Sequence, residues 1–331
     1  MVRNYFITFV LLIILVITSG WLFLPSYVDQ KVKEAVAGIS TTASQLPKLI
    51  SPTPEAEDKE SIMFVSDISG NNEIYTFNLA DKKMVNISEN KSEDMNPQLS
   101  PDGNYIVFYS NRSGNNQIYQ MDLKSREVIQ LTRNSADDFD PSYSPDGKTI
   151  VFKSNRDDKI GDIFTMNADG TGQKNLTPTR KLTEEWDPAF SVDGDRIIFV
   201  VRKGNDDKTD EIYVMNKDGN GLKQLTNNLL VDWYPSINPK TGRIIFVSRE
   251  PNETTDDIYM MEENSTNRSR VVSLRGNDAD PSWDAAGEKI IFIRENETNY
   301  DLYMMNEDAS DLTKLMTTDK DELSPIFMSA N

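Results

Sequence analysis

The 331-residue sequence contains neither cysteine nor histidine. Without cysteine, disulfides, thiolate metal sites, thiol nucleophiles and lipid attachment to a cysteine are excluded. Without histidine, Ser-His-Asp and Cys-His catalysis and histidine-ligated zinc or iron sites are excluded as well. Any chemistry would have to use carboxylates, hydroxyls, Tyr, Lys or Arg. Any bound metal would have to be a hard cation that prefers oxygen ligands, and we expect no cofactor.

Basic residues are scarce relative to acidic ones. The chain has 53 acidic and 35 basic residues, which gives a net charge of −18. Residues 1–60 carry 5 basic and 6 acidic residues, so nearly all of the excess negative charge belongs to residues 61–331. A surface of this charge repels phosphate backbones, and we therefore expect no nucleic-acid partner.

The N-terminus carries a run of 20 uncharged, mostly apolar residues, from Tyr5 to Leu24. This length matches the ~30 Å hydrocarbon core of a membrane when it is helical. Residues 1–25 are thus predicted to form a transmembrane signal anchor, with a cleaved signal peptide as the alternative. Residues 26–60 are predicted to form a short helix and a flexible linker rich in Ser, Thr and Pro. Both alternatives place the remaining chain outside the cytoplasm, and the anchor makes it a single-pass protein of the cell membrane.

A unit of about 45 residues repeats through residues 61–331. A proline recurs in each unit, at steps of 44 to 47 residues: Pro97, Pro141, Pro188, Pro235, Pro281 and Pro325. After the proline comes a turn such as Ser-Pro-Asp-Gly, then an apolar run ending in Phe, then a segment such as IYQMD, and finally a short segment such as VIQLT. The Asp-Gly turns between apolar runs favour hairpins, because glycine readily adopts a positive φ.

These units predict an all-β, six-bladed β-propeller closed by the C-terminal strand. Each unit reads as four antiparallel strands, of which the first is short and follows the proline, and this is the composition of a propeller blade. The repeat region begins with the second strand of a blade, SIMFVSD, and ends with a first strand, ELSPIFMSAN. Joined in space, the two segments complete a sixth blade, so removal of residues 322–331 is expected to open the ring.

The recurring motifs SPDG, IVF, IYxMN and QLT resemble the PD40 (WD40-like) repeats of the TolB-type β-propellers, and the resemblance covers residues 61–331. It implies the propeller fold. Related propellers serve as interaction modules of the cell envelope or as gating domains attached to peptidases. The namesake of the family also has a separate α/β domain, for which residues 26–60 are too short. A role in a Tol–Pal-like complex is therefore not expected.

An acidic residue precedes each repeated proline by three positions, and we call the six the acid ring. They are Asp94, Asp138, Glu185, Asp232, Asp278 and Glu322. We predict that they lie in the loops leading to the innermost strands, around one mouth of the central channel. One interpretation is a negative potential that binds a basic partner or a hard cation such as calcium. The other is structural: each carboxylate caps backbone N–H groups or pairs with an Arg of a neighbouring blade, such as Arg112 or Arg294.

Aromatic residues break the sixfold pattern on two adjacent units. Trp186, Trp233 and Tyr234 fall in the two positions before the proline, where the other units have different residues. They are predicted to lie near the same channel mouth. Aromatic residues at a surface are typical of interfaces, although these could instead fill the space between blades.

From these patterns we expect a non-catalytic binding module for an envelope protein or polysaccharide, with the acid ring and the aromatic residues as its contact rim. The alternatives are a glycan hydrolase that uses carboxylates and a structural spacer in a surface layer. No nucleophile or phosphate-binding motif supports an enzyme. Eight Asn-x-Ser/Thr sequons, slightly more than chance predicts, permit N-glycosylation; they begin at Asn86, Asn90, Asn111, Asn175, Asn252, Asn264, Asn267 and Asn296.

Overall fold

The computed structural model describes residues 61–157, 159–178, 183–203, 210–228, 230–250, 253–272 and 276–328. All of the regular secondary structure in these residues is β-strand. Among them there is no helix long and apolar enough to span a membrane. The predicted N-terminal anchor and the linker lie outside the described residues.

The strands form six sheets of four strands each, which we name blades A to F. Blade A contains β24 (Glu322–Phe327), β1 (Ser61–Ser66), β2 (Glu73–Asn78) and β3 (Met84–Asn86). Blade B contains β4 (Asp94–Leu99), β5 (Tyr105–Ser110), β6 (Gln117–Asp122) and β7 (Val128–Gln130). Blade C contains β8 (Asp138–Tyr143), β9 (Thr149–Ser154), β10 (Asp162–Asn167) and β11 (Lys174–Asn175).

The second half of the ring follows the same plan. Blade D contains β12 (Thr183–Phe190), β13 (Arg196–Lys203), β14 (Glu211–Asn216) and β15 (Lys223–Gln224). Blade E contains β16 (Val231–Ile237), β17 (Ile244–Arg249), β18 (Asp257–Met261) and β19 (Ser269–Arg270). Blade F contains β20 (Asp278–Trp283), β21 (Lys289–Glu295), β22 (Tyr300–Asn306) and β23 (Thr313–Lys314).

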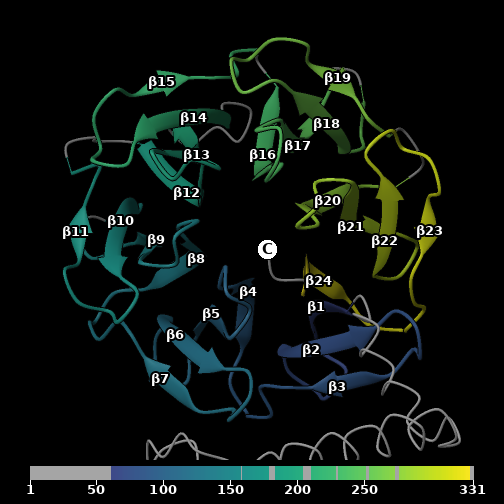
Figure 1. Cartoon of the computed structure of the whole chain (residues 1–331), viewed down its shortest axis with the longest axis horizontal. Coiled ribbons are helices and arrows are strands. Elements are labelled where there is room, and N and C mark those ends of the chain that lie inside the picture. The colour runs from purple at the N-terminus through teal and green to yellow at the C-terminus, as the bar shows by residue number, and fades with distance from the viewer. Residues whose placement is uncertain are drawn as a thin grey trace, which may run out of the picture. The chain divides into compact units, whose positions relative to one another are not determined.

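The blades surround a central channel, with the first strand of each blade innermost and the shortest strand outermost (Figure 1). The six-bladed propeller predicted from the repeats is therefore confirmed. One detail of the prediction is wrong. The inner strands begin at or before the acidic residue and include the proline, rather than following it. A proline is tolerated there because the inner strand is the edge of its sheet and needs no hydrogen-bonding partner on the channel side.

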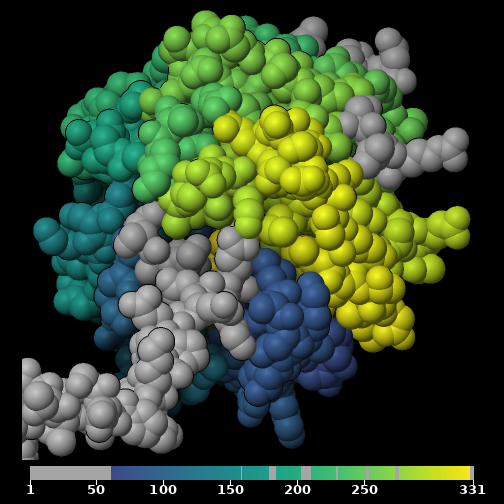
Figure 2. Space-filling view, turned by 45° about the vertical axis from the view of Figure 1, so that its right-hand side comes forward, coloured from purple at the N-terminus to yellow at the C-terminus, as the bar shows by residue number. Residues whose placement is uncertain are grey.

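The C-terminal strand closes the ring, as predicted. β24 pairs antiparallel with β1, so that Glu322 lies opposite Ser66 and Ile326 opposite Met63. Figure 2 shows the blue surface of the N-terminal strands of the ring beside the yellow surface of its C-terminal residues. The first and last strands of the repeat region thus belong to one sheet, and no open sheet edge is left between them.

An aromatic pair on the two middle strands recurs in every blade. The Phe of the second strand lies against the Tyr or Phe of the third, as in Phe108–Tyr119 and Phe292–Tyr303, with ring centroids 6.0 and 5.8 Å apart. The second-strand Phe is fully buried in all six blades. Burial of such a side chain contributes about 1.5–3 kcal/mol, so these pairs make up much of the core between neighbouring blades.

Candidate binding site in the central channel

All six carboxylates of the acid ring lie at the start of the inner strands, at one end of the channel. We call this end the acidic mouth. Each of the six residues is at most 1 % exposed. The residue two positions later faces the channel instead, because a bulge in the inner strand, as between Met95 and Gln98, interrupts the regular alternation after the acidic residue. The ring is therefore covered by the blades and does not form an open negative surface.

Three of the carboxylates accept hydrogen bonds from an Arg of their own blade. Arg112 Nη2 donates to both oxygens of Asp94 at 2.8 Å, and Arg156 pairs with Asp138 in the same way at 3.0 and 2.9 Å. Arg294 binds Asp278 through Nε at 2.6 Å and Nη2 at 3.0 Å. The structural interpretation predicted an Arg from a neighbouring blade, and that detail is wrong. The pairing stays within a blade because the Arg lies at the end of the second strand, next to the carboxylate: Arg294 is part of β21, whereas Arg112 and Arg156 lie two residues beyond β5 and β9.

The other three carboxylates have different surroundings. Asp232 accepts hydrogen bonds from Ser248 Oγ at 2.5 Å and Asn228 Nδ2 at 2.9 Å, and Arg268 Nη2 lies 4.0 Å from its Oδ1. Burial raises the pKa of Asp232. Glu185 is buried opposite Val201 of β13. Glu322 accepts a hydrogen bond from Thr318 through Oε1, whereas its Oε2 is buried with no partner among the described residues. Burial raises the pKa of Glu322 to about 7.

The predicted aromatic residues do meet at the acidic mouth. The Trp186 and Trp233 rings are 6.2 Å apart and nearly perpendicular, and the Tyr234 ring lies 6.3 Å from Trp186 and 6.2 Å from Trp233. Arg202 is stacked on Trp186 at 5.2 Å. All three aromatic residues are half-buried. The indole nitrogens of Trp186 and Trp233 are buried and find no hydrogen-bond acceptor among the described residues.

The residue before each proline lines the waist of the channel. These six residues all have φ between 47° and 51°: Asn96, Asp140, Asp187, Tyr234, Asp280 and Ser324. Positive φ is uncommon for residues other than glycine and costs on the order of 1–3 kcal/mol. It coincides with a bulge in the pairing of the inner strand, for example between Met95 and Gln98. The bulge turns the side chain into a cavity of about 280 Å³.

Three aspartates face one another in this cavity, and their pKa values are raised. Burial is the main cause for Asp140, and it raises the pKa of Asp280 to about 6. The pKa of Asp187 lies well above its usual range because of burial, reinforced by the charges of Asp140 and Asp280. Lys153 opposes the shift of Asp140 and Asp187. The Oδ2 atom of Asp187 is buried without a partner among the described residues.

Hydrogen bonds link these residues from blade to blade. Asp140 accepts from Asn96 Nδ2 at 2.6 Å and from the backbone of Asp187, which in turn accepts from the backbone of Tyr234. On the other side, Ser324 donates its backbone N–H to Asp280 at 3.1 Å and its hydroxyl to Asn96 at 2.7 Å. These hydrogen bonds form a belt across five of the six junctions between neighbouring blades.

No metal centre is formed by the residues that the structure describes: no group of three or more Asp or Glu side chains is arranged to hold an ion. The oxygens of the acid ring are largely engaged with Arg, Ser, Thr and Asn side chains, as described above. The predicted calcium-like cation at the channel mouth therefore gains no support from this geometry.

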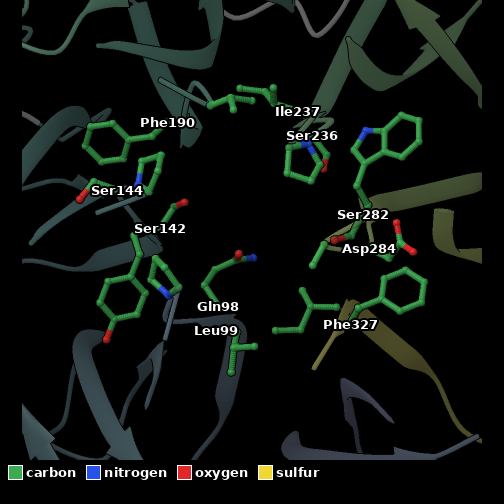
Figure 3. Close-up of a pocket in the computed structure, with 18 of the residues that line it drawn as sticks. Gln98, Leu99, Ser142, Ser144, Phe190, Ser236, Ile237, Ser282, Asp284 and Phe327 are labelled. Carbon is green, nitrogen blue, oxygen red and sulfur yellow. The ribbon is translucent and has the colours of Figure 1, made fainter. Parts of the chain in front are cut away.

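The opposite end of the channel, which we call the turn mouth, opens into a cavity of about 420 Å³. Figure 3 shows Gln98, Ser142, Ser236 and Ser282 near the middle of this cavity, with Phe190 and Phe327 farther out. The sequence analysis did not predict this cavity. The available signal was the small or polar residue directly after most of the repeated prolines, which faces the channel.

The three waist aspartates were likewise missed as a group, although they occupy the same repeat position as Tyr234. They could have been predicted from the residue before the repeated proline, because this is the one inner-strand position whose charge varies from blade to blade. The structure thus adds a half-buried carboxylate cluster below the predicted aromatic rim.

Comparisons with known proteins agree with this architecture. A family model described as PD40, TolB beta propeller domain, matches residues 36–184, 118–205 and 183–330. No curated protein sequence matches the chain. Among solved structures, TolB from Acinetobacter baumannii is 18% identical, with a TM-score of 0.69 over 93% of this chain and 74% of that one.

Two further structures share the fold. A chain in the nidogen/laminin complex is 11% identical, with a TM-score of 0.63 over 82% of this chain and 99% of that one. Oligogalacturonate lyase from Vibrio parahaemolyticus is 15% identical, with a TM-score of 0.56 over 77% and 74%. At these identities the likeness concerns the fold alone.

Proposed function

Because the chain belongs to the PD40 family of TolB β-propeller domains, we propose that it is a non-catalytic, protein-binding module of the cell envelope. In this proposal the N-terminal segment anchors it in the cell membrane and the propeller lies outside the cytoplasm. The family and the TolB-like fold support a protein-binding role. A similar propeller also occurs in a complex of two proteins, nidogen and laminin.

The observation that carries the proposal is the aromatic rim formed by Trp186, Trp233 and Tyr234. Trp, Tyr and Arg are the residues that contribute most to protein interfaces, and here Arg202 is stacked on Trp186. The waist aspartates behind the rim favour a bound segment that carries a Lys or Arg side chain. A polysaccharide is the alternative ligand.

Site-specific photocrosslinking in intact cells tests this function. A photoreactive phenylalanine analogue replaces Tyr234 at the rim, and in a control chain it replaces Tyr105, which is exposed at the start of β5. We expect one discrete protein adduct at position 234 and none at 105. In the chain that carries the analogue at 234, Trp233→Ala should weaken the adduct at least tenfold while the melting temperature stays above the growth temperature. A protease-resistant carbohydrate adduct would support the polysaccharide, and no adduct would refute the rim as a contact surface.

A glycan hydrolase is the second candidate, and the raised pKa of Asp187 is the observation that favours it. A carboxylic acid whose pKa is raised by burial can act as a general acid. The belt of hydrogen bonds explains the same cluster structurally. Release of reducing ends from isolated envelope polysaccharide that disappears in Asp187→Asn would favour the hydrolase, and no release by the unmodified chain would exclude it for that substrate.

A further inference from the structure

The eight sequons differ in whether their acceptor nitrogen is available. N-glycosylation forms a bond to Nδ2 of the asparagine, so this atom must reach solvent and must not be held inside the fold. Asn252 lies outside the described residues. The other seven can be sorted by the hydrogen bonds that their side-chain amides make.

Four of the seven donate Nδ2 to groups of the propeller. Asn86 donates to the Tyr75 hydroxyl at 3.4 Å, and Asn90 donates to Asp94 of the acid ring. Asn175 donates to Asp157 and Asp162, both at 2.8 Å. Asn296 donates to Asn299 at 2.7 Å and to Asp301 at 2.5 Å. These sequons are part of the hydrogen-bonding structure of the blades, and modification would break it.

Asn264 has the opposite arrangement. It is exposed, in the turn that connects β18 and β19 at the outer edge of blade E. Its Oδ1 accepts hydrogen bonds from the backbone N–H of Thr266 at 3.0 Å and from the Thr266 hydroxyl at 2.6 Å. No hydrogen bond from its Nδ2 to a described residue is present. The Thr266 hydroxyl of the sequon is therefore hydrogen-bonded to the side-chain amide oxygen of Asn264, while the amide nitrogen makes no hydrogen bond to a described residue.

The turn also has room for a sugar. Asn264 borders a groove of about 220 Å³ between blades D and E, together with Glu263, Arg196 and Lys223. Asn111 and Asn267 are exposed too, but neither has its sequon hydroxyl bonded to its own amide: Ser113 of the first accepts from Gln130 at 3.3 Å. Asn264 alone among the described sequons combines a free Nδ2, a bonded Thr hydroxyl and an adjacent groove.

We propose that Asn264 is an N-glycosylation site of this protein. Its Nδ2 displaces the phosphate at C1 of a saccharide carried on a lipid (pyro)phosphate. The N–C bond forms, the C–O bond breaks, the phosphate leaves with the bonding electrons, and the proton lost by the amide passes to the leaving phosphate. The Thr266 hydroxyl, by donating to Oδ1, stabilises the electron-rich amide oxygen and so eases this proton loss. The inference rests on the proposed location outside the cytoplasm, where a membrane-bound transferase would meet the chain.

The position fits the proposed function, because β18 and β19 lie toward the outer edge of the ring, away from the channel (Figure 1). A glycan there would leave the aromatic rim open.

Mass spectrometry of the full chain purified from its native membranes tests the inference. We expect a glycan that electron-transfer fragmentation places on Asn264, and unmodified Asn86, Asn90, Asn175 and Asn296. Thr266→Ala should remove the glycan mass and Thr266→Ser should retain it. Thr298→Ala, which destroys the sequon of Asn296, should leave the mass unchanged.

Protease added to intact cells tests the location separately, because it digests only a propeller that lies outside the cytoplasm. If the propeller is digested and Asn264 is unmodified, the inference is overturned and the proposed location stands. A glycan on Asn267 instead would also overturn the inference. Glycosylated Asn264 without a crosslink at position 234 would refute the binding function alone, so the two failures are distinguishable.

Discussion

Glu322→Gln should stabilise the propeller at neutral and alkaline pH, although it removes a charge from a ring that occurs in all six blades. Glu322 is fully buried in the strand that closes the ring, and its Oε2 has no partner among the described residues. It accepts a hydrogen bond from Thr318 but, unlike Asp94, forms no ion pair with an Arg of the described part of the chain. Glutamine keeps the size of the side chain and can keep the contact with Thr318 without placing a charge in the core.

The magnitude follows from the pKa. Burial raises the pKa of Glu322 from its ordinary value of 4.5 to about 7, and a shift of this size corresponds to ~3 kcal/mol. The folded chain holds this proton more tightly than the unfolded chain. The free energy of unfolding therefore falls as the pH rises from about 4.5 to about 7 and then stays low. Because glutamine does not titrate, the variant should gain up to ~3 kcal/mol over the unmodified chain at pH 8 and little at pH 4.5.

Urea unfolding followed by tryptophan fluorescence at pH 4.5, 6 and 8 measures this difference. Other carboxylates titrate in the same range, so the quantity to plot is the difference between the variant and the unmodified chain. Asp94→Asn is the matched control: it breaks a buried pair with Arg112 and should destabilise the fold by about 3 kcal/mol at pH 8. A difference for Glu322→Gln that is independent of pH, or a loss of stability at pH 8, would refute the reasoning.

Two further predictions concern the ring and its backbone. Removal of residues 322–331 exposes the edge of β1 and deletes the buried side chains of Ile326 and Phe327. Burial of each of these side chains contributes about 1.5–3 kcal/mol. Limited proteolysis should then cut blade A first, and an unchanged digestion pattern would contradict closure by β24. Gly276→Ala would place a Cβ 2.2 Å from the carbonyl oxygen of Glu295, whereas Gly70, with nearly the same φ, has nothing within 4 Å. Gly276→Ala and Gly70→Ala both incur the strain of a positive φ, of about 1–2 kcal/mol. Gly276→Ala should lower the melting temperature clearly more than Gly70→Ala. Equal melting temperatures of the two variants would argue against the close packing at Gly276.

The architecture could be predicted from the sequence because it depends on features that repeat. The proline spacing gave the number of blades, and the Asp-Gly turns gave the hairpins: Gly103 and Gly147 adopt the positive φ that these turns require. The incomplete units at the two ends of the repeat region predicted that the last strand closes the ring by pairing with the first. The contact of Trp186 with Trp233 also followed, since equivalent positions on adjacent blades are neighbours in a propeller.

The partners of the carboxylates could not be predicted, because they depend on how each strand continues past the sheet. In blades B and C the Arg lies two residues beyond the strand end and folds back onto Asp94 or Asp138. In blade D the second strand extends to Lys203, and Arg202 binds Asp210 and Glu184 instead. The same residue type at the same repeat position therefore has a different partner, and only the three-dimensional path of the chain decides which.

The side chains that repeat in every blade and the side chains that differ between blades have different surroundings in the channel. A side chain that every blade retains, such as the acid-ring carboxylate, must fit six similar environments, and its burial shows that the blades enclose it. The residue before the proline meets no such requirement, because it points into the open channel, where it can be Asn, Asp, Tyr or Ser. Its positive φ is maintained in all six blades while its chemistry changes. The fold therefore fixes the direction of this side chain and leaves its identity free, which is the condition under which a symmetric ring can acquire an asymmetric binding site.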